Sequence, residues 1–169
     1  SKLKYAVLGG TPFNMVHGMN AFEYPSVDTR FNEVFTKAMA RSVIFVRNIF
    51  NKYRVLENSN VKQLVDVGGG LGHSVGFITS RYPSIKGINF DLPYVIKDAP
   101  PTPGVEHVGG DMFESVPKGD SIFLKSDDCC LTLLKNCYKA LQANGKIIVV
   151  EVIVNDEPET TRIAQAISQ

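Results

Sequence analysis

The stretch Leu64–Gly72 reads LVDVGGGLG and joins an apolar, strand-like run to a glycine-rich turn. The segment after the turn, His73–Tyr82, has the pattern of a helix. In open α/β sheets, ligands bind beyond the carboxyl ends of the strands, where glycines allow close approach and a helix N-terminus offers free N–H groups. The stretch therefore predicts an α/β fold with a cofactor site at this turn.

Strand-like and helical segments alternate downstream of the turn. This alternation predicts a mostly parallel sheet with helices on both faces. The clearest helix follows Ser126 and is expected to close at Asn144-Gly145. Its apolar positions recur at helical spacing: Cys130, Leu133, Leu134, Cys137, Tyr138 and Leu141. The predicted strands are Gln63–Val67, Ile85–Phe90, Val105–Val108, Ser121–Leu124 and Lys146–Ile153.

The part of the chain before residue 60 reads as helical. Apolar residues from Phe31 to Tyr53 fit one face of a helix, and Asp28 or Thr29 is the candidate N-cap. We therefore expect two parts. Residues 1–60 form a helical linker and substrate-pocket segment, and residues 61–169 form the cofactor-binding domain.

The composition argues against several kinds of partner. Eighteen basic and seventeen acidic residues give a net charge of +1, so neither nucleic acid nor an anionic membrane is expected. No apolar run approaches the ~18 residues of a membrane span, and we expect a soluble, cytoplasmic protein. Cys129, Cys130 and Cys137 lack the paired spacing of a zinc site or a disulfide framework, and are expected to be reduced structural thiols.

Two acidic residues follow later strands. Asp91 ends the second strand, 23 residues beyond Gly68, where a carboxylate accepts the ribose hydroxyls of an adenosine. Asp111 and Met112 follow the third strand, where Asp111 can hold an adenine amino group while Met112 packs on the ring. Either acid alone also fits a helix cap or a solvated loop. Both together, after a glycine turn, favour a nucleoside site.

The spacing of the glycines separates two classes of enzyme. Gly68, Gly70 and Gly72 form G-x-G-x-G, whereas the dinucleotide fingerprint places its third glycine where His73 stands. This spacing favours a methyltransferase that binds S-adenosylmethionine over a nicotinamide-dependent dehydrogenase.

Longer strings carry a family resemblance over nearly the whole chain. The sequence resembles the catalytic domain of plant O-methyltransferases of the caffeic-acid and flavonoid type, which implies a Rossmann-like class I methyltransferase domain preceded by a helical segment. It also implies a phenylpropanoid, flavonoid or alkaloid phenol as substrate and a cytoplasmic homodimer. The matching strings are Leu64–Gly72, Tyr82–Pro93, Ala99–Pro117, Ile122–Lys125 and Leu133–Leu141.

The resemblance also implies roles for individual residues. Asp66 is expected to orient the glycine turn. No metal ligand cluster is visible, so no metal is expected. Pro25 and Ser42 stand where caffeic-acid enzymes have histidines, which favours a phenol other than caffeic acid.

The residues matching S-adenosylmethionine contacts are Gly68, Asp91, Asp111, Met112 and Lys125. Those matching the phenol pocket are Phe31, Phe35 and Met39, although helical periodicity explains these three equally well as core residues.

One departure concerns the general base. In the family, a tryptophan-rich stretch with the histidine that deprotonates the substrate follows the strand ending at Lys125, but here Ser126 comes next and Trp is absent. His17, His73 and His107 do not match that position and are expected to be structural. No catalytic residue is assigned. The sequence indicates a partial chain, incomplete at the C-terminus, and an inactive cofactor-binding or dimer-forming fragment is the alternative.

Overall fold

The computed structural model describes residues 12–19, 24–41, 43–57, 59–125 and 130–150. Its centre is a five-stranded sheet with the order β3-β2-β1-β4-β5, and every neighbouring pair is parallel. The predicted parallel sheet is confirmed. The strands are β1 (Gln63–Val67), β2 (Lys86–Asp91), β3 (Val105–Gly109), β4 (Gly119–Leu124) and β5 (Leu141–Val149).

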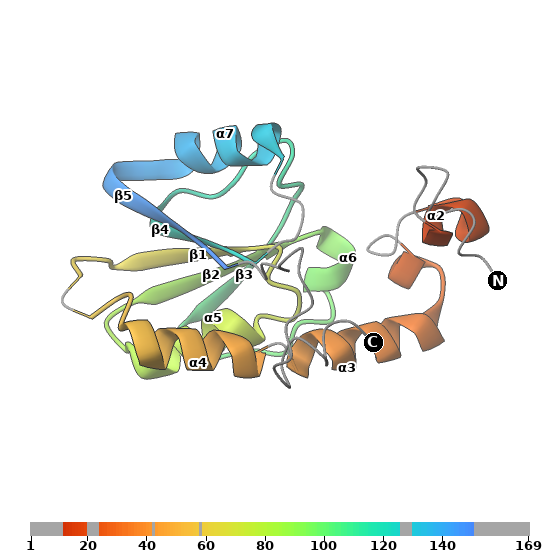
Figure 1. The fold of residues 1–169 in the computed structure, drawn as a ribbon, viewed down its shortest axis with the longest axis horizontal. Coiled ribbons are helices and arrows are strands. Elements are labelled where there is room, and N and C mark those ends of the chain that lie inside the picture. The colour runs from red at the N-terminus through yellow and green to blue at the C-terminus, as the bar shows by residue number, and fades with distance from the viewer. Residues whose placement is uncertain (1–11, 20–23, 42, 58, 126–129, 151–169) are drawn as a thin grey trace, which may run out of the picture.

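Helices cover both faces of this sheet (Figure 1). On one face lies α7 (Leu131–Ala140), and on the other lie α4 (Val43–Tyr53) and α5 (His73–Arg81). The short α6 (Pro93–Ile96) sits near the edge where the strands end. The remaining elements, α2 (Pro12–His17), η1 (Tyr24–Ser26) and α3 (Thr29–Arg41), lie beyond this edge.

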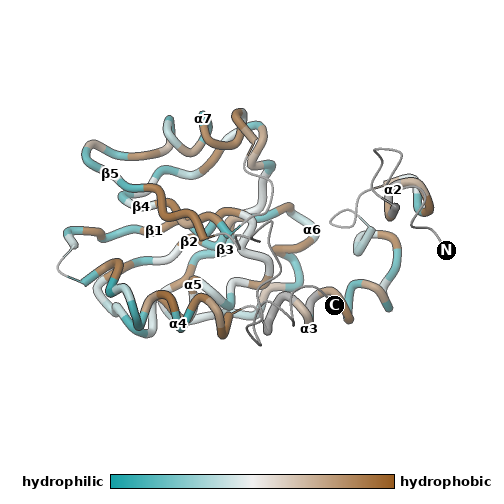
Figure 2. The backbone as a smooth tube through the Cα atoms, in the orientation of Figure 1, coloured by the Kyte–Doolittle hydropathy of each residue, from teal (hydrophilic) through white to brown (hydrophobic). Residues whose placement is uncertain are grey.

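Strand alternation divides the core between the two faces. Leu64 packs with Phe50 of α4 and Val75 of α5, whereas the next residue, Val65, packs with Leu133 of α7. Both faces of the central strands are apolar, as expected for a parallel sheet covered on both sides. Figure 2 shows hydrophobic stretches along the central strands and alternating hydrophobic and hydrophilic residues along the helices.

The upstream helical prediction is correct in type but differs in detail. Asp28 Oδ1 accepts a hydrogen bond from the Phe31 N–H at 2.9 Å, so Asp28 is the N-cap of α3. The single predicted helix is described as α3 and α4, and residue 42 between them lies outside the described residues. Val46 and Phe50 are buried, but Val34 is 63% exposed. The apolar pattern therefore overestimated the buried face.

The predicted end of the last helix is wrong. Helix α7 ends at Ala140, and Leu141 already belongs to β5, which runs through Asn144-Gly145 to Val149. The register between β4 and β5 shifts between Gly119 and Ser121, and this irregularity accommodates the turn-like Asn144 (φ 63°) within the strand. Tyr138, assigned to the apolar face, is 77% exposed. The Asn144-Gly145 turn therefore forms as its sequence suggests, but inside the last strand rather than at the end of the helix.

Cys137 is buried in the core and Cys130 is exposed, while Cys129 lies outside the described residues. Within the described part of the chain, none of the helices is both long enough and apolar enough to cross a bilayer.

Candidate functional site

The glycine turn after β1 adopts a conformation that requires glycine. Gly68, Gly70 and Gly72 have φ values of 70°, 60° and 83°, a region that side chains with a Cβ avoid. The Gly68 N–H donates to the Phe90 carbonyl at 2.8 Å, which ties the turn to β2. A Cβ added at Gly68 or Gly70 would meet no atom within 4 Å. The turn therefore presents its backbone to open space, where a ligand can approach it closely.

Asp91 lies at the carboxyl end of β2 beside this turn. Its Oδ2 accepts the Gly70 N–H at 2.7 Å, and its Oδ1 accepts the Leu92 N–H at 2.7 Å. Burial raises the pKa of Asp91 above its ordinary value, and these two hydrogen bonds oppose that rise. The carboxylate is thus fixed in orientation, and each oxygen keeps a second lone pair for a ligand hydroxyl.

The loop after β3 brings Asp111 and Met112 to the same edge of the sheet. Asp111 Oδ1 accepts the Phe113 N–H at 2.8 Å, and Met112 packs partly buried against the α7-facing core. Asn136 of α7 donates two hydrogen bonds to this loop, to the Met112 carbonyl at 3.1 Å and to the Phe113 carbonyl at 2.9 Å. The buried side-chain amide of Asn136, which was not among the candidates from the sequence, therefore fixes the backbone of this loop.

The third side of the site is the end of β4. Lys125 follows Leu124 directly and is half-buried. Its charge acts on the buried carboxyl of Asp66 in β1. The turn, Asp91, Asp111, Met112 and Lys125 all follow carboxyl ends of neighbouring strands, so the parallel sheet brings all five cofactor candidates to one edge.

A row of three polar side chains lies directly beneath the turn. Asp66, Asn89 and His107 occupy matching register positions on β1, β2 and β3. Asp66 and Asn89 are 2% and 0% exposed, respectively. We call these three residues the polar row. The sequence analysis expected Asp66 to orient the turn and His107 to be structural, and it missed Asn89; the one available signal was a polar residue inside an apolar strand.

The substrate candidates lie apart from this row. Phe31 and Phe35 stack in α3 with ring centroids 5.8 Å apart, and Phe31 also contacts Phe13 and Tyr24 at 5.3 and 5.2 Å. Met39 lies in the last turns of α3. Figure 1 places α3 on the side of the molecule where the strands end. Phe31 and Phe35 thus belong to an aromatic cluster of their own, on a helix that lies on the side of the molecule where the strands end.

None of the three histidines occupies the expected position of a base. His17 packs in the aromatic cluster, 4.4 Å from Phe13 and 4.3 Å from Tyr24 between ring centroids. His73 is the exposed first residue of α5, and His107 lies within β3. The junction after Lys125, at which the sequence analysis expected the base, continues into residues 126–129, which lie outside the described residues.

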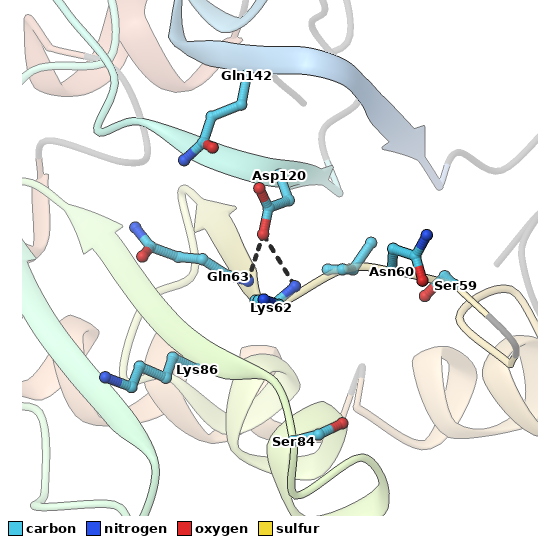
Figure 3. A pocket seen from close by; sticks show the side chains of 9 residues that line it. Ser59, Asn60, Lys62, Gln63, Ser84, Lys86, Asp120 and Gln142 are labelled. Atoms are coloured by element: carbon cyan, nitrogen blue, oxygen red, sulfur yellow. Dashed lines mark hydrogen bonds between the residues drawn. The ribbon is translucent and has the colours of Figure 1, made fainter.

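An open hollow of about 1050 Å³ lies at the opposite edge of the sheet (Figure 3). Asp120 accepts the backbone N–H groups of Lys62 and Gln63 there, both at 2.9 Å, so its carboxylate is occupied in joining β4 to β1. This hollow surrounds the amino ends of the strands, whereas ligands of open parallel sheets bind at the carboxyl ends. It is therefore not the candidate site.

Comparisons with known proteins agree with one another. A family model described as an O-methyltransferase domain matches residues 1–168. O-methyltransferase 16 of Lophophora williamsii is 66% identical over 177 aligned positions, covering 100% of this chain and 47% of the relative. Caffeic acid 3-O-methyltransferase of Capsicum chinense is 55% identical, covering 90% of this chain and 44% of the relative. The crystal structure of LaPhzM superposes with a TM-score of 0.82 at 28% identity, covering 93% of this chain and 51% of that one.

The chain therefore spans about half the length of the curated relatives it matches. The alignment with the first of these relatives extends over 177 positions, whereas this chain has 169 residues. Some positions of that relative accordingly have no counterpart in this sequence.

Proposed function

The chain belongs to the O-methyltransferase family, and from this premise we propose that it transfers a methyl group from S-adenosylmethionine to a hydroxyl of a phenolic small molecule. Its sheet order and its likeness to LaPhzM agree with the Rossmann-like methyltransferase fold expected from the sequence. One observation carries the proposal. The sheet gathers the glycine turn, Asp91 and the Asp111–Met112 loop at one edge, in an arrangement that fits an adenosine and its attached amino acid.

The proposed cofactor site divides into three parts. Asp91 accepts the ribose hydroxyls, because its oriented carboxylate keeps free lone pairs beside the turn. Asp111 and Met112 hold the adenine by a hydrogen bond and by apolar packing. The open backbone at Gly68 faces the amino acid end, and Lys125 completes the edge. The turn has room for the cofactor, because the positions of a Cβ on Gly68 and Gly70 are surrounded by open space.

The cofactor supplies an electrophilic methyl group on a sulfonium, so the protein contributes mainly positioning and proton removal. A phenol with a pKa near 10 needs a base before it attacks efficiently at neutral pH. No described histidine is assigned that role. Because Ser126 directly follows Lys125 here, we propose that the base belongs to a tryptophan-rich stretch of the whole enzyme that this sequence does not include.

Phe31, Phe35 and Met39 are proposed to line the phenol pocket, because α3 lies on the cofactor side of the sheet. The relative from Capsicum chinense is named for caffeic acid. Pro25 and Ser42 favour another phenylpropanoid, a flavonoid or an alkaloid phenol for this chain. The homodimer, the cytoplasmic location and the division at residue 60 stay predictions.

A transfer assay tests the proposed function. Purified protein is incubated with S-adenosylmethionine labelled in the methyl group and with a panel of phenols, and labelled methyl ethers are separated by chromatography. We expect label in at least one phenol and S-adenosylhomocysteine as the second product. The rival is a module that binds the cofactor without catalysis. Binding of S-adenosylhomocysteine without any transfer favours that rival, and the absence of binding rejects the cofactor assignment.

A further inference from the structure

The polar row is aligned across three strands by the register of the sheet. Asp66 pairs with Asn89, and Asn89 pairs with His107. Since side chains alternate along a strand, all three share one face, on which the first turn of α5 also packs. A Cβ added at Gly72, just before α5, would lie 2.9 Å from His107 Cε1 and 3.3 Å from Asn89 Cγ. The row therefore forms the floor of the glycine turn.

Asn89 connects this floor to the turn by hydrogen bonds whose direction can be assigned. Its Nδ2 donates to the Gly70 carbonyl at 2.8 Å and lies 3.1 Å from His107 Nδ1. His107 Nε2 lies 3.0 Å from the Pro100 carbonyl, which only accepts. Nε2 must therefore carry the proton, and Nδ1 accepts from Asn89. One neutral histidine tautomer thus satisfies every contact.

Two buried oxygens in the same row have no donor. They are Asp66 Oδ2 and Asn89 Oδ1. Both face the space beneath Gly69, because a Cβ added there would overlap Asn89 Oδ1 and would lie 2.8 Å from Asp66 Oδ2. An unpaired buried acceptor is costly, and two such acceptors that both lie within 2.8 Å of the same point repel each other. A single proton placed between them would satisfy both.

We propose that Asp66 is a positioning residue whose carboxyl is protonated below neutral pH and then donates a hydrogen bond from Oδ2 to Asn89 Oδ1. Asn89 then has both donors and its acceptor engaged, and it holds the Gly70 carbonyl, and with it the turn, in the cofactor-binding shape. This inference rests on the proposed function only for the identity of the ligand.

The electrostatics of the site support this assignment. Burial raises the pKa of Asp66 from 3.8 to about 7. The backbone N–H of Val75 and the charge of Lys125 lower the pKa, while the carboxylate of Asp91 raises it. Val75 N–H also gives the Asp66 carboxyl its one described donor, so α5 and Asn89 contact the same group. Desolvation outweighs the nearby cation because Asp66 is 2% exposed.

Two substitutions separate the neutral acid from a carboxylate. In Asp66→Asn, the amide oxygen accepts from Val75 and the amide nitrogen donates to Asn89 Oδ1, so this variant copies the protonated acid. Asp66→Ala removes both contacts. We expect Asp66→Asn to bind S-adenosylhomocysteine within about threefold of wild type, and Asp66→Ala to bind about tenfold more weakly or worse. Ser121→Ala, which loses a buried hydrogen bond to the Lys146 carbonyl at 3.2 Å far from the turn, is the matched control and should keep its affinity.

Titration calorimetry near pH 6 and near pH 8 adds a readout that a structural role does not produce. Wild-type affinity should fall between these two pH values by more than that of Asp66→Asn. An equal loss of affinity in Asp66→Asn and Asp66→Ala would overturn the proposal, as would weakened folding of Asp66→Ala with unchanged affinity. If Asp66→Ala fails to fold, the comparison of wild type with Asp66→Asn still decides.

A spectrum without ligand keeps this test independent of the proposed function. Infrared spectroscopy of the wild type near pH 6 should contain the carbonyl band of a buried carboxylic acid, and Asp66→Asn should lack it. Absence of this band in the wild type would refute the protonated state even if the cofactor binds. Its presence in a protein that binds no S-adenosylhomocysteine would reject the proposed ligand and retain the protonated Asp66.

Discussion

Gly70 donates its backbone N–H to Asp91 Oδ2 across 2.7 Å, although the two residues are 21 positions apart in the sequence. This bond joins the turn after β1 to the end of β2, and it fixes the carboxylate that we assign to the ribose. The same glycine is held from below through its carbonyl by Asn89. The turn is therefore shaped from two sides before any ligand arrives.

Asp91→Ala should weaken S-adenosylhomocysteine binding by about 1.5–3 kcal/mol, the range for hydrogen bonds to a charged group. Titration calorimetry on folded protein measures this. Asp120→Ala is the matched control, because Asp120 also accepts two backbone N–H groups but at the opposite edge of the sheet. Equal affinities of Asp91→Ala and wild type would remove Asp91 from the site.

S-adenosylhomocysteine should raise the melting temperature by mass action, whereas NAD and NADP should not. The reason is the glycine spacing, in which His73 begins α5 where a dinucleotide fold has its third glycine. Thermal unfolding with each ligand in excess is the measurement. Stabilisation by a nicotinamide cofactor alone would contradict the assigned class of enzyme.

Substitutions in the glycine turn should separate the cost of backbone strain from the cost of steric overlap. In Gly70→Ala the added Cβ would lie in open space, but the alanine would have to adopt a φ of 60°. We therefore expect backbone strain to lower the free energy of unfolding by about 1–2 kcal/mol, and Gly70→Asn to lower it less. Gly69→Ala should cost more than either, because its Cβ would overlap Asn89 Oδ1. Urea unfolding gives the three free energies. The opposite order would show that the floor of the turn moves easily.

Asn136→Ala should loosen the loop after β3, which we assign to the adenine and call the adenine loop, because the Asn136 amide donates to both the Met112 and Phe113 carbonyls. Leaving two carbonyls without this donor should cost about 1–3 kcal/mol of stability and should weaken S-adenosylhomocysteine binding several-fold. Calorimetry and urea unfolding are measured together. Ser121→Ala again serves as the control, with lost stability and unchanged affinity. Unchanged affinity in Asn136→Ala would show that the loop keeps its shape unaided.

The stability of the protein should depend on pH through Asp66. Its folded pKa of about 7 lies above the unfolded value of 3.8, so the native state binds the proton more tightly. This contribution is fully present below the unfolded pKa and is lost as pH rises through about 7, by an amount on the order of 2–4 kcal/mol. Unfolding free energies across this window should fall more steeply for wild type than for Asp66→Asn. Parallel curves would mean that Asp66 ionises normally.

The sequence by itself determined the alternation of strands and helices along the chain and the edge of the sheet at which the cofactor candidates gather. Apolar runs separated by glycine and acidic residues leave few alternatives, because short buried strands followed by helices pack only as a parallel sheet. The candidates Gly68, Asp91 and Asp111 followed from their places at strand ends. Local chemistry also offered Asp28 or Thr29 as the N-cap, and the hydrogen bond from the Phe31 N–H selects Asp28.

Tertiary structure decided what local patterns could not. Asn144-Gly145 looks like the end of a helix, yet α7 already ends at Ala140, and the dipeptide keeps its turn conformation inside β5, between Leu141 and Lys146, the residues that pair with β4 on either side of it. The polar row depends on the register of three strands, which no single segment contains, and its burial sets the protonation of Asp66. Asn136 reaches the adenine loop only after α7 packs on the sheet. The sequence named the residues that we propose for the cofactor, and the packing of the sheet decided which residues hold them in place, since that depends on contacts between segments far apart in the chain.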